Sequence, residues 1–431
     1  MDRKRLEIAR LFHRFGFGPK PGEFEQAMLA GVQSTREKIL SVSKSPTSSF
    51  VSDPVIVDLG RRPAPNTAEV IDFANNRRNQ IEKMQLWWLD LMVLSGEALV
   101  EKMTWFWHGH WATSIQKVDY PLPMYQQNNI LREYCLSDFT KMTKEMVNDA
   151  ALQLWLDGPS STAKAPNENL ARELMELFTL GVNRYTEQDV KEVARVLTGY
   201  QVVPWSGQVI INPRRQDKNP VTIFGQTRIL NSESLVEILV QRKDCQRFIP
   251  ERIWYRFISS SEKMKDNFEA VDAFHSRDIA QAVTATVNST AISNPKYELV
   301  KSPVEWFVAA CRALELVPSK LESSEKLINH LNKLGQVPFL PPNVGGWPTD
   351  QGWLSSATAL YRVAFTNWLI QQSRLRVISE IPVAQRTQKS ADWLGVPEWS
   401  ERTKLVLDES ASNPAQFALL ALCSPDYIVS R

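Results

Sequence analysis

Cysteine and histidine are scarce in this chain of 431 residues, which holds four of the first and five of the second. The cysteines lie far apart, form no Cys-x-x-Cys pair and sit among apolar neighbours, a pattern typical of free, buried thiols. They offer no framework for a haem or radical enzyme. The four are Cys135, Cys245, Cys311 and Cys423. A histidine-based metal site could draw only on His13, His108, His110, His275 and His330.

Long apolar runs and an excess of one charge are also missing. No run of about 18 apolar residues occurs, so the sequence predicts no transmembrane helix. Fifty Lys and Arg against 48 Asp and Glu leave a net charge of +2, which gives no electrostatic footprint for nucleic acid or an anionic membrane. The charged N-terminal segment precedes no apolar stretch of the kind found in signal peptides, so the sequence as written predicts a cytoplasmic protein.

Common catalytic and nucleotide-binding signatures are absent. The chain contains no Gly-x-Gly-x-x-Gly after a strand, no Gly-x-x-x-x-Gly-Lys-Ser/Thr, no Gly-x-Ser-x-Gly and no His-Glu-x-x-His. A Rossmann dehydrogenase, a P-loop NTPase, an α/β-hydrolase and a zincin would each lack the residues on which its chemistry depends.

The chain is instead rich in helix signals, and apolar residues make up 43% of it, enough for a substantial core. Residues 42–67 lack periodicity and are rich in Ser, Pro and Asp, which predicts a surface loop. Short β-prone runs predict a hairpin at 201–225, and prolines and glycines predict a rigid loop at 336–349. No linker divides the chain, so we expect one large, mainly α domain over residues 1–431. Apolar spacing and capping residues predict helices at about 2–14, 21–31, 67–94 and 96–107, and others beginning after Asn167, Thr186 and Ser302.

Seven segments, in chain order, are similar to one family. They are Arg14-Phe-Gly-Phe-Gly-Pro19, Phe106-Trp-His-Gly-His-Trp-Ala-Thr-Ser114, Asn167-Glu-Asn-Leu-Ala-Arg-Glu-Leu-Met-Glu-Leu-Phe-Thr-Leu-Gly-Val182, Tyr185-Thr-Glu-Gln-Asp-Val190 with Leu197-Thr-Gly-Tyr200, Val300-Lys-Ser-Pro-Val-Glu305, Pro341-Pro-Asn-Val-Gly-Gly-Trp-Pro348 and Ser424-Pro-Asp-Tyr427. Together they resemble the bacterial family catalogued as domain of unknown function 1800, over essentially the whole chain. The resemblance implies no established activity. It implies that relatives are commonly exported, and it suggests a sulfatase-like partner protein of unknown function by family analogy.

Two positions depart from the pattern that this resemblance implies. Many relatives have histidine where this chain has Gln216, in a segment whose usual lysine has no clear counterpart here. Some relatives also have histidine where Phe178 stands. If those histidines serve chemistry, the resemblance implies that this chain has weakened or lost it.

His108-Gly109-His110 is the first candidate site. Side chains two residues apart on a helix point about 200° apart, so both imidazoles could hold one metal only in extended backbone at Gly109. Imidazole pairs suit zinc, copper, iron or nickel, which makes a divalent metal the candidate cofactor. The alternative is structural: the helix ends at Gly109, His108 lies near its negative end, and His110 packs among neighbouring tryptophans.

A carboxylate-rich helix is the second candidate. At 100° per residue, Glu168, Asn169, Arg172, Glu173 and Glu176 share one face, opposite a continuous apolar arc. Three carboxylates with Asn and Arg could hold a metal or supply paired acid and base groups. The alternative is a solvated face on which Glu168, Arg172 and Glu176 form an ion-pair ladder at successive four-residue steps.

The third candidate is the loop around Asn343 and Trp347. Flanking prolines stiffen this loop, while Gly345 and Gly346 allow its backbone to come close to a ligand or to another part of the fold. Trp347 and the tryptophans near Trp107 could stack against sugar rings, although a tryptophan-rich segment inside helices is also typical of a core.

Two functional classes remain open after these observations. One is a metal-assisted, hydrolytic enzyme with His108 and His110 as metal ligands. In that class the catalytic groups would be Glu168, Glu173 and Glu176, and the substrate-binding groups Trp107, Arg172, Asn343 and Trp347. The other is a non-catalytic helical binding or assembly protein in which these motifs hold the fold. The convergence of the histidine motif and the carboxylate helix in one cleft would favour the enzyme.

Overall fold

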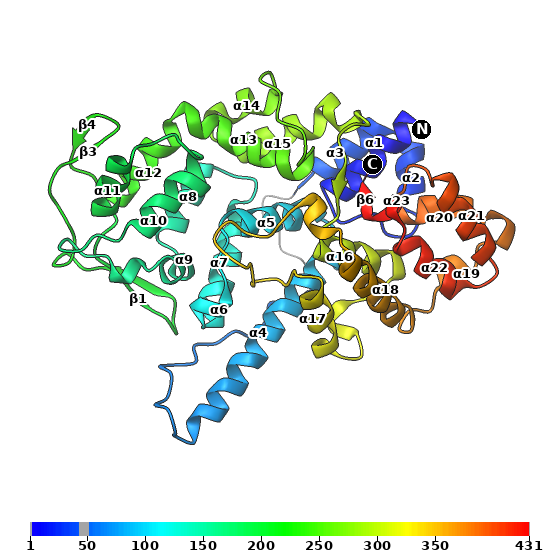
Figure 1. Ribbon diagram of the computed structural model, residues 1–431, viewed down its shortest axis with the longest axis horizontal. Coiled ribbons are helices and arrows are strands. Elements are labelled where there is room, and N and C mark those ends of the chain that lie inside the picture. The colour runs from blue at the N-terminus through cyan, green and yellow to red at the C-terminus, as the bar shows by residue number, and fades with distance from the viewer. Residues whose placement is uncertain (1, 43–50, 431) are drawn as a thin grey trace.

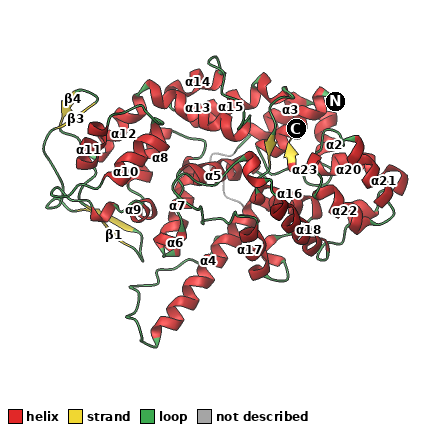
Figure 2. Cartoon of the chain, in the orientation of Figure 1, coloured by secondary structure: helices red, strands yellow, loops and turns green. Residues whose placement is uncertain are grey.

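Helices make up most of the chain in the computed structural model, which describes residues 2–42 and 51–430 (Figure 2). The predicted mainly α fold is therefore confirmed. Local capping explains several helix starts. Thr186 and Asp189 form the predicted capping box, and the backbone N–H of Ser302 donates to the carboxylate of Glu305 at 3.0 Å.

The first half of the chain holds the predicted helices near residues 2–14, 21–31 and 67–94, and each is present. Its helices are α1 (Arg3–Arg14), α2 (Glu23–Ala30), α3 (Val32–Leu40), α4 (Glu69–Leu94), α5 (Ala98–His110), α6 (Ile115–Val118), α7 (Pro121–Tyr134), α8 (Phe139–Val147), α9 (Ala150–Trp155), the 3-10 helix η1 (Gly158–Ser160), α10 (Glu168–Glu173), the π-helix η2 (Leu174–Thr179) and α11 (Glu187–Val196).

The second half is also helical, and residues 336–349 form an irregular loop, as predicted. Its helices are α12 (Ser232–Gln241), α13 (Lys243–Phe257), α14 (Glu269–Ala273), η3 (Phe274–Ser276), α15 (Ile279–Asn288), η4 (Thr290–Ser293), α16 (Pro303–Leu314), η5 (Pro318–Lys320), α17 (Ser324–Lys333), η6 (Asp350–Trp353), α18 (Ser356–Ile370), α19 (Arg376–Ser379), α20 (Val383–Leu394), α21 (Glu401–Ser410), α22 (Pro414–Leu422) and α23 (Pro425–Ile428).

The β structure differs from the single hairpin predicted at 201–225. Two hairpins occupy that region, and positive φ at Phe224 and Gly225 provides the tight turn of the second. A third two-stranded sheet joins distant segments, and its two-residue strands are too short for periodicity to reveal. The antiparallel pairs are β1 (Tyr200–Val203) with β2 (Gln208–Ile211), β3 (Val221–Ile223) with β4 (Gln226–Arg228), and β5 (Leu299–Val300) with β6 (Val429–Ser430).

Helix α5 runs further than predicted. We expected it to end near Trp107 or Gly109, but it continues through Gly109 and its last residue is His110. Every residue from Leu99 to His110 is buried. Packing on all sides stabilises the helix and outweighs the low helix propensity of one glycine, which is worth about 1 kcal/mol.

Most of the apolar core lies in two large clusters that share α5. Phe106 and Trp107 belong to one cluster, and Trp105 belongs to the other, so the same helix contributes to both. All four cysteines are free thiols, as predicted, and three of them are buried. Because α5 lies between the clusters, its polar side chains are held in fixed, buried environments.

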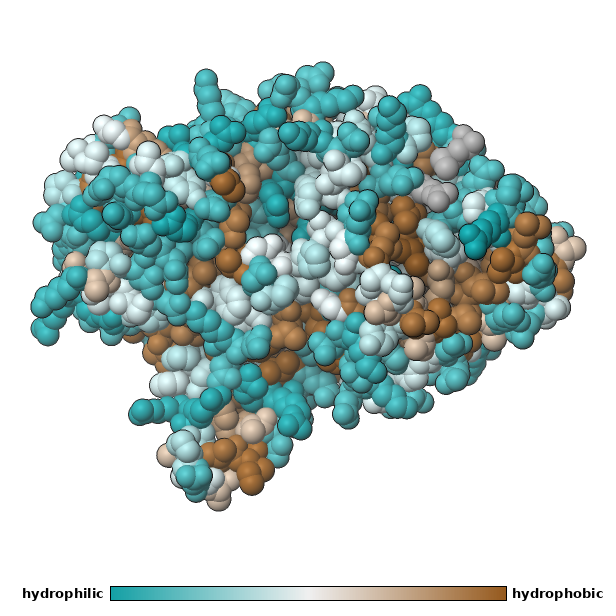
Figure 3. All heavy atoms as spheres, in the orientation of Figure 1, coloured by the Kyte–Doolittle hydropathy of each residue, from teal (hydrophilic) through white to brown (hydrophobic). Residues whose placement is uncertain are grey.

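Figure 1 shows the N- and C-terminal ends close together, and α1 contacts β6. The first half of α4 and the loop before it project from the body. Of the predicted loop 42–67, residues 51–66 are irregular, and residues 43–50 lie outside the described residues. The face in Figure 3 is mainly hydrophilic, with apolar groups gathered toward the side of α18 to α22. None of the described helices combines the length and apolar character that a membrane crossing demands.

Candidate functional site

The two histidines of the His-Gly-His motif face different parts of the core. The ring of His108 lies 5.1 Å from that of Trp88 and 5.5 Å from that of Phe339. The ring of His110 lies 6.1 Å from that of Phe178. This divergence follows from the helical backbone at Gly109, because residues two apart on a helix point away from each other. The extended backbone that joint metal binding requires is absent.

Both imidazoles already make hydrogen bonds inside the protein. Nε2 of His108 accepts the backbone N–H of Phe339 at 3.1 Å, and Nε2 of His110 donates to the carbonyl of Phe178 at 3.0 Å. Burial lowers the pKa of His108 to about 3. Burial, aided by the positive charge of Arg252, lowers the pKa of His110 to about 3. Both rings are therefore neutral near pH 7, and each holds a neighbouring segment in place.

The described part of the chain contains no group of three or more His, Cys, Asp or Glu side chains arranged to hold a metal ion. The geometry therefore gives no support to a divalent metal on His108 and His110. The catalytic and substrate-binding roles assigned from the sequence stay predictions.

The carboxylate-rich helix forms a paired surface instead of an open set of acids. Arg172 bonds Glu168 at 3.1 Å and Glu187 at 2.8 Å, so the first step of the predicted ladder exists. Glu176 accepts a hydrogen bond from the hydroxyl of Tyr185. The Glu168, Arg172 and Glu187 side chains are 38%, 34% and 70% exposed, which is typical of a solvated ion-pair network.

Glu173 and Phe178 lie in the same helical segment. Burial, reinforced by the negative charge of Glu176, raises the pKa of Glu173. The ring centres of Phe178 and Trp111 lie 4.4 Å apart, and the backbone carbonyl of Phe178 accepts the hydrogen bond from Nε2 of His110. The π-helix η2 contributes this contact, so the carboxylate helix meets the histidine motif through a backbone carbonyl and apolar rings.

The loop of the third candidate lies against the end of α5. A Cβ atom added at Gly346, where φ is +83°, would lie 2.5 Å from the carbonyl oxygen of Gly109. Of the two partners that the sequence left open for this loop, a ligand or another part of the fold, the close contact at Gly346 is therefore with another part of the fold, the end of α5. Asn343 is exposed and accepts the backbone N–H of Gly345 at 2.9 Å, and Trp107 is fully buried, with its indole N–H bonded to the carbonyl of Cys135.

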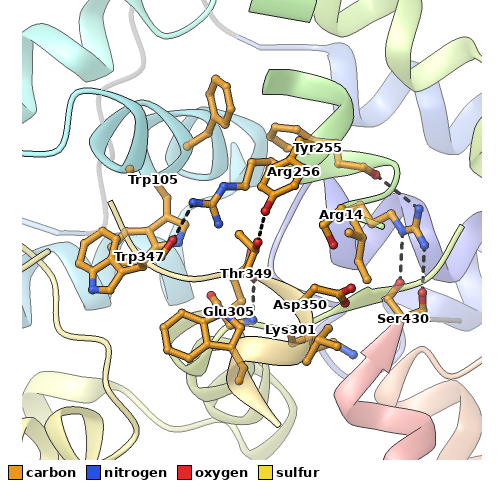
Figure 4. A pocket seen from close by; sticks show the side chains of 18 of the residues that line it. Arg14, Trp105, Tyr255, Arg256, Lys301, Glu305, Trp347, Thr349, Asp350 and Ser430 are labelled. Carbon is orange, nitrogen blue, oxygen red and sulfur yellow. Dashed lines mark hydrogen bonds between the residues drawn. The ribbon is translucent and has the colours of Figure 1, made fainter. Parts of the chain in front are cut away.

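Trp347 lines a different site. This site is a pocket between α1, α5, α13, β5, the start of α16 and the loop around residue 350. Figure 4 shows this pocket, with Arg256 and Tyr255 above Glu305, Lys301 and Asp350 in that view. Four of the segments that resemble the family contribute to its lining, through Arg14, Gly109, Lys301 and Trp347. Its volume of about 60 Å³ has room for a few waters or a small polar group.

Basic groups outnumber acidic groups in this pocket. Lys102 forms an ion pair with Glu305 and donates to the carbonyl of His13 at 3.2 Å. Burial alone would raise the pKa of Glu305, but Lys102 and the bonds from Ser302 lower it. Glu305 is therefore ionised and engaged with Lys102. Its charge balances that of Lys102, so it does not pair with Arg14, Arg256 or Lys301.

Lys301 has a sparser environment than Lys102. Only 7% of the residue is exposed. Its Nζ donates to the carbonyl of Tyr427 and lies 4.4 Å from the centre of the Tyr427 ring. Within the described residues it makes no ion pair. Burial, opposed by Glu305 but assisted by Lys102 and Arg14, lowers the pKa of Lys301 to about 7.

Two arginines of the pocket differ in how fully they are bonded. Arg14 donates to the carbonyls of Ile258 at 2.8 Å and Ser430 at 2.9 Å, and to two further carbonyls. It therefore joins α1 to α13 and β6. Arg256 makes one long hydrogen bond of 3.5 Å, to the carbonyl of Trp347, and has no carboxylate partner in the described residues. Gly109 leaves space beside it, since a Cβ there would lie 3.8 Å from Nη2 of Arg256.

Aromatic and hydroxyl groups complete the wall. Trp105 and Trp347 stack with ring centres 5.0 Å apart. The hydroxyls of Tyr255 and Thr349 are hydrogen-bonded at 2.5 Å. Asp350 follows directly, with a left-handed φ of +51° that is uncommon for aspartate.

Sequence reasoning missed most of this pocket, although Trp347 was a candidate. Arg256 lies in none of the candidate segments of the sequence, and Lys301 stands out in the sequence only as part of a resembling segment. The one available signal is that two of the resembling segments that line the pocket each contain a single cation, Arg14 in one and Lys301 in the other. Their burial together was not visible in the sequence.

Comparison with known proteins gives one result. A family model described as "Protein of unknown function (DUF1800)" matches residues 10–429. No curated protein and no solved structure matches the chain. The matched region takes in all seven resembling segments and every pocket residue named above except Ser430. The chain therefore belongs to the DUF1800 family of proteins of unknown function.

Proposed function

We propose that the pocket around Arg256 binds a small organic anion. One observation carries this proposal: Arg256 lines a half-enclosed pocket and has a single long hydrogen bond and no carboxylate partner in the described residues. A guanidinium has five N–H donors in a planar fork, which matches a carboxylate, phosphate or sulfate group. Most of these donors are directed at no acceptor of the described protein.

The surrounding charges support an anionic ligand. Arg14, Lys102, Arg256 and Lys301 line the pocket together with only two carboxylates, those of Glu305 and Asp350. Burial lowers the pKa of Arg256 to about 10, so this group stays charged near pH 7. A bound anion would supply the counter-charge that a partly buried guanidinium requires.

The volume of the pocket and the side chains of its wall restrict which anions can bind. A volume of about 60 Å³ accommodates a head group and not a whole cofactor, since ligand pockets typically measure roughly 300–1,000 Å³. Trp105 and Trp347 offer an apolar wall beside Arg256. We therefore infer a ligand with one compact anionic group and a short apolar or planar part. This proposal takes the place of metal-assisted hydrolysis, because the histidines diverge and their Nε2 atoms are occupied.

Calorimetric titration of the full chain with acetate, benzoate, inorganic phosphate and sulfate tests the proposal, with benzamide as the neutral analogue. We expect at least one anion to bind, and Arg256→Met to weaken it about ten-fold or more, since a hydrogen bond to a charged group contributes about 1.5–3 kcal/mol.

Arg252→Met is the matched control. Arg252 lies one helical turn before Arg256 on α13 and is also half-buried, but it does not line the pocket. It should produce a much smaller loss of affinity. No binding of any anion at millimolar concentration, or equal binding by Arg256→Met and the unmodified protein, would overturn the proposal.

A further inference from the structure

We propose that Lys301 is a nucleophilic amine that forms an imine with the carbonyl group of the bound anion, so that the ligand is an oxo acid. This inference rests on the proposed anion-binding function and names its substrate class. In it, Arg256 binds the carboxylate, and Lys301 reacts with the ketone of the same molecule.

The first support is the contrast between two buried lysines of one pocket. Lys102 has a carboxylate partner, Glu305, and a backbone carbonyl as a second acceptor. Lys301 has one hydrogen-bond acceptor, the carbonyl of Tyr427, and the face of the Tyr427 ring 4.4 Å away, for an ammonium that carries three donors. A buried ammonium with one acceptor is costly, whereas a neutral amine needs fewer acceptors and keeps a free lone pair.

The second support is the charge around Lys301. Lys102 and Arg14 both act on it as like charges, which disfavours its ammonium form, and only Glu305 acts in the opposite direction. Desolvation and a neighbouring cation are the two conditions that activate lysine amines for attack on carbonyl carbon. A pKa of about 7 leaves roughly half of the Lys301 side chains as neutral amine at pH 7.

The reaction balances without an outside oxidant or reductant. The nitrogen lone pair of Lys301 attacks the carbonyl carbon, and the carbonyl π electrons move to oxygen. The proton that nitrogen loses goes to this oxygen, and a C–N bond joins the ligand to the enzyme. The carbinolamine then expels its oxygen as water, with the second nitrogen proton, and leaves a C=N bond.

The pocket suits the size of such a ligand. A short 2-oxo acid has its carboxylate and ketone on adjacent carbons, so one compact molecule supplies both the charge for Arg256 and the carbonyl for Lys301. Lys301 and Arg256 line the same small pocket. The remaining chain of the ligand would lie toward Trp105 and Trp347.

Reductive trapping tests the imine. The full chain is incubated with pyruvate, 2-oxoglutarate or acetoacetate in the presence of cyanoborohydride, which reduces an imine to a stable amine. Intact-mass measurement and peptide mapping then locate the adduct. We expect saturable modification of Lys301 at least ~10-fold faster than of exposed lysines such as Lys191, because burial lowers the pKa of Lys301 and makes its neutral amine available near pH 7.

Controls separate the imine from simple binding. Lactate has the anion without the ketone and should protect Lys301 from modification. Acetone has the ketone without the anion and should react more slowly. Lys301→Arg keeps the positive charge but cannot form a stable imine, and Lys301→Met is the second variant if the arginine disturbs folding, which circular dichroism would show.

The outcomes distinguish the two proposals. Binding of lactate or benzoate without trapping of any of the three oxo acids would overturn the imine and leave anion binding standing. Modification spread evenly over surface lysines, or unchanged in the Lys301 variants, would also overturn it. Absence of both binding and trapping would overturn both proposals.

Discussion

Two of the charged clusters in this protein, the carboxylate-rich helix and the pocket, differ in what surrounds each charge. On the carboxylate-rich helix, Arg172 pairs with Glu168 and Glu187, and all three side chains are at least one-third exposed. In the pocket, the Lys102 side chain is 5% exposed and pairs with Glu305, whereas Lys301 is buried without an ion pair in the described residues. The first is a solvated network, and the second is a buried, unbalanced one.

The comparison shows that a chemically useful composition is a weak guide to a site. Exposed ion pairs contribute about 0–1 kcal/mol and keep their ordinary chemistry, because water solvates each group. Buried charges with too few partners change their pKa values and favour ligands that complete them. The difference between the two regions can be tested by removing matched groups from each.

The largest expected effect is from Glu305→Gln, which leaves Lys102 buried without its carboxylate. Breaking a buried pair typically costs about 3–5 kcal/mol. Glu168→Gln is the matched change on the surface network, and it should cost at most about 1 kcal/mol. Urea unfolding at pH 7 compares the two. Equal losses would show that burial does not separate the regions.

The next effect is the pH dependence that Lys301 imposes on stability. Its folded pKa of about 7 lies below the ordinary value of 10.5, so the unfolded chain binds the extra proton between these values. Stability therefore rises as pH increases from about 7 toward 10.5, by an amount on the order of 2–4 kcal/mol.

Lys301→Met should remove this rise, while Lys191→Met, an exposed lysine, should retain it. Urea unfolding at intervals from pH 7 to 10 measures the slope. An unchanged slope in Lys301→Met would mean that its ammonium is better solvated than the structure indicates.

A smaller effect is expected at His108, which accepts the backbone N–H of Phe339. His108→Phe leaves that buried donor unsatisfied and should cost about 1–3 kcal/mol at pH 7. The pKa of His108 is lowered to about 3, so the unfolded chain protonates first as pH falls below about 6.5.

The unmodified protein therefore loses stability on acidification, and the deficit of His108→Phe should shrink between pH 7 and pH 5. His275→Phe, at an exposed histidine, serves as the control. Thermal unfolding at the two pH values gives the comparison, and a deficit that widens at pH 5 would contradict it.

The smallest effect is from Glu173→Gln. Burial raises the pKa of Glu173, so its ionised form is disfavoured in the folded state. The resulting loss of folding stability is therefore fully present at pH values above the folded pKa. The neutral amide removes this cost, and we expect stability at pH 7 to change by no more than about 0.5 kcal/mol, toward stabilisation. The difference should vanish near pH 3. A loss of several kcal/mol would place Glu173 in a buried pair that the structure does not show.

The helix starts could be predicted because their causes are local. Thr186 and Asp189 bond each other's backbone within one turn, and their spacing is visible in the sequence. The continuation of α5 through Gly109 could not be predicted from the sequence, because it depends on packing against both core clusters. The paired β5 and β6 strands are two residues each, and their partners are about 130 residues apart, so no local pattern announces them.

The pocket was harder to predict from the sequence, because it too depends on contacts between distant segments. The polar face of Glu168, Arg172 and Glu176 shows in the sequence as a helical period, and the Glu168–Arg172 ion pair is present, but Glu176 bonds Tyr185 instead of Arg172. Arg256 and Lys301 are 45 residues apart, and neither stands in an unusual local pattern. Their importance comes from burial and from missing partners, which are properties of the tertiary fold.

The sheet of β5 and β6 has a consequence for how the protein opens. It ties residues 429–430 to residues 299–300, next to Lys301, while Arg14 of α1 bonds the carbonyl of Ser430. The pocket thus closes only when segments more than 400 residues apart have docked. A ligand bound in the pocket therefore stabilises the docked arrangement of these segments, so it should slow amide hydrogen exchange across α1, α13 and α16 together and add its binding free energy to the free energy of unfolding.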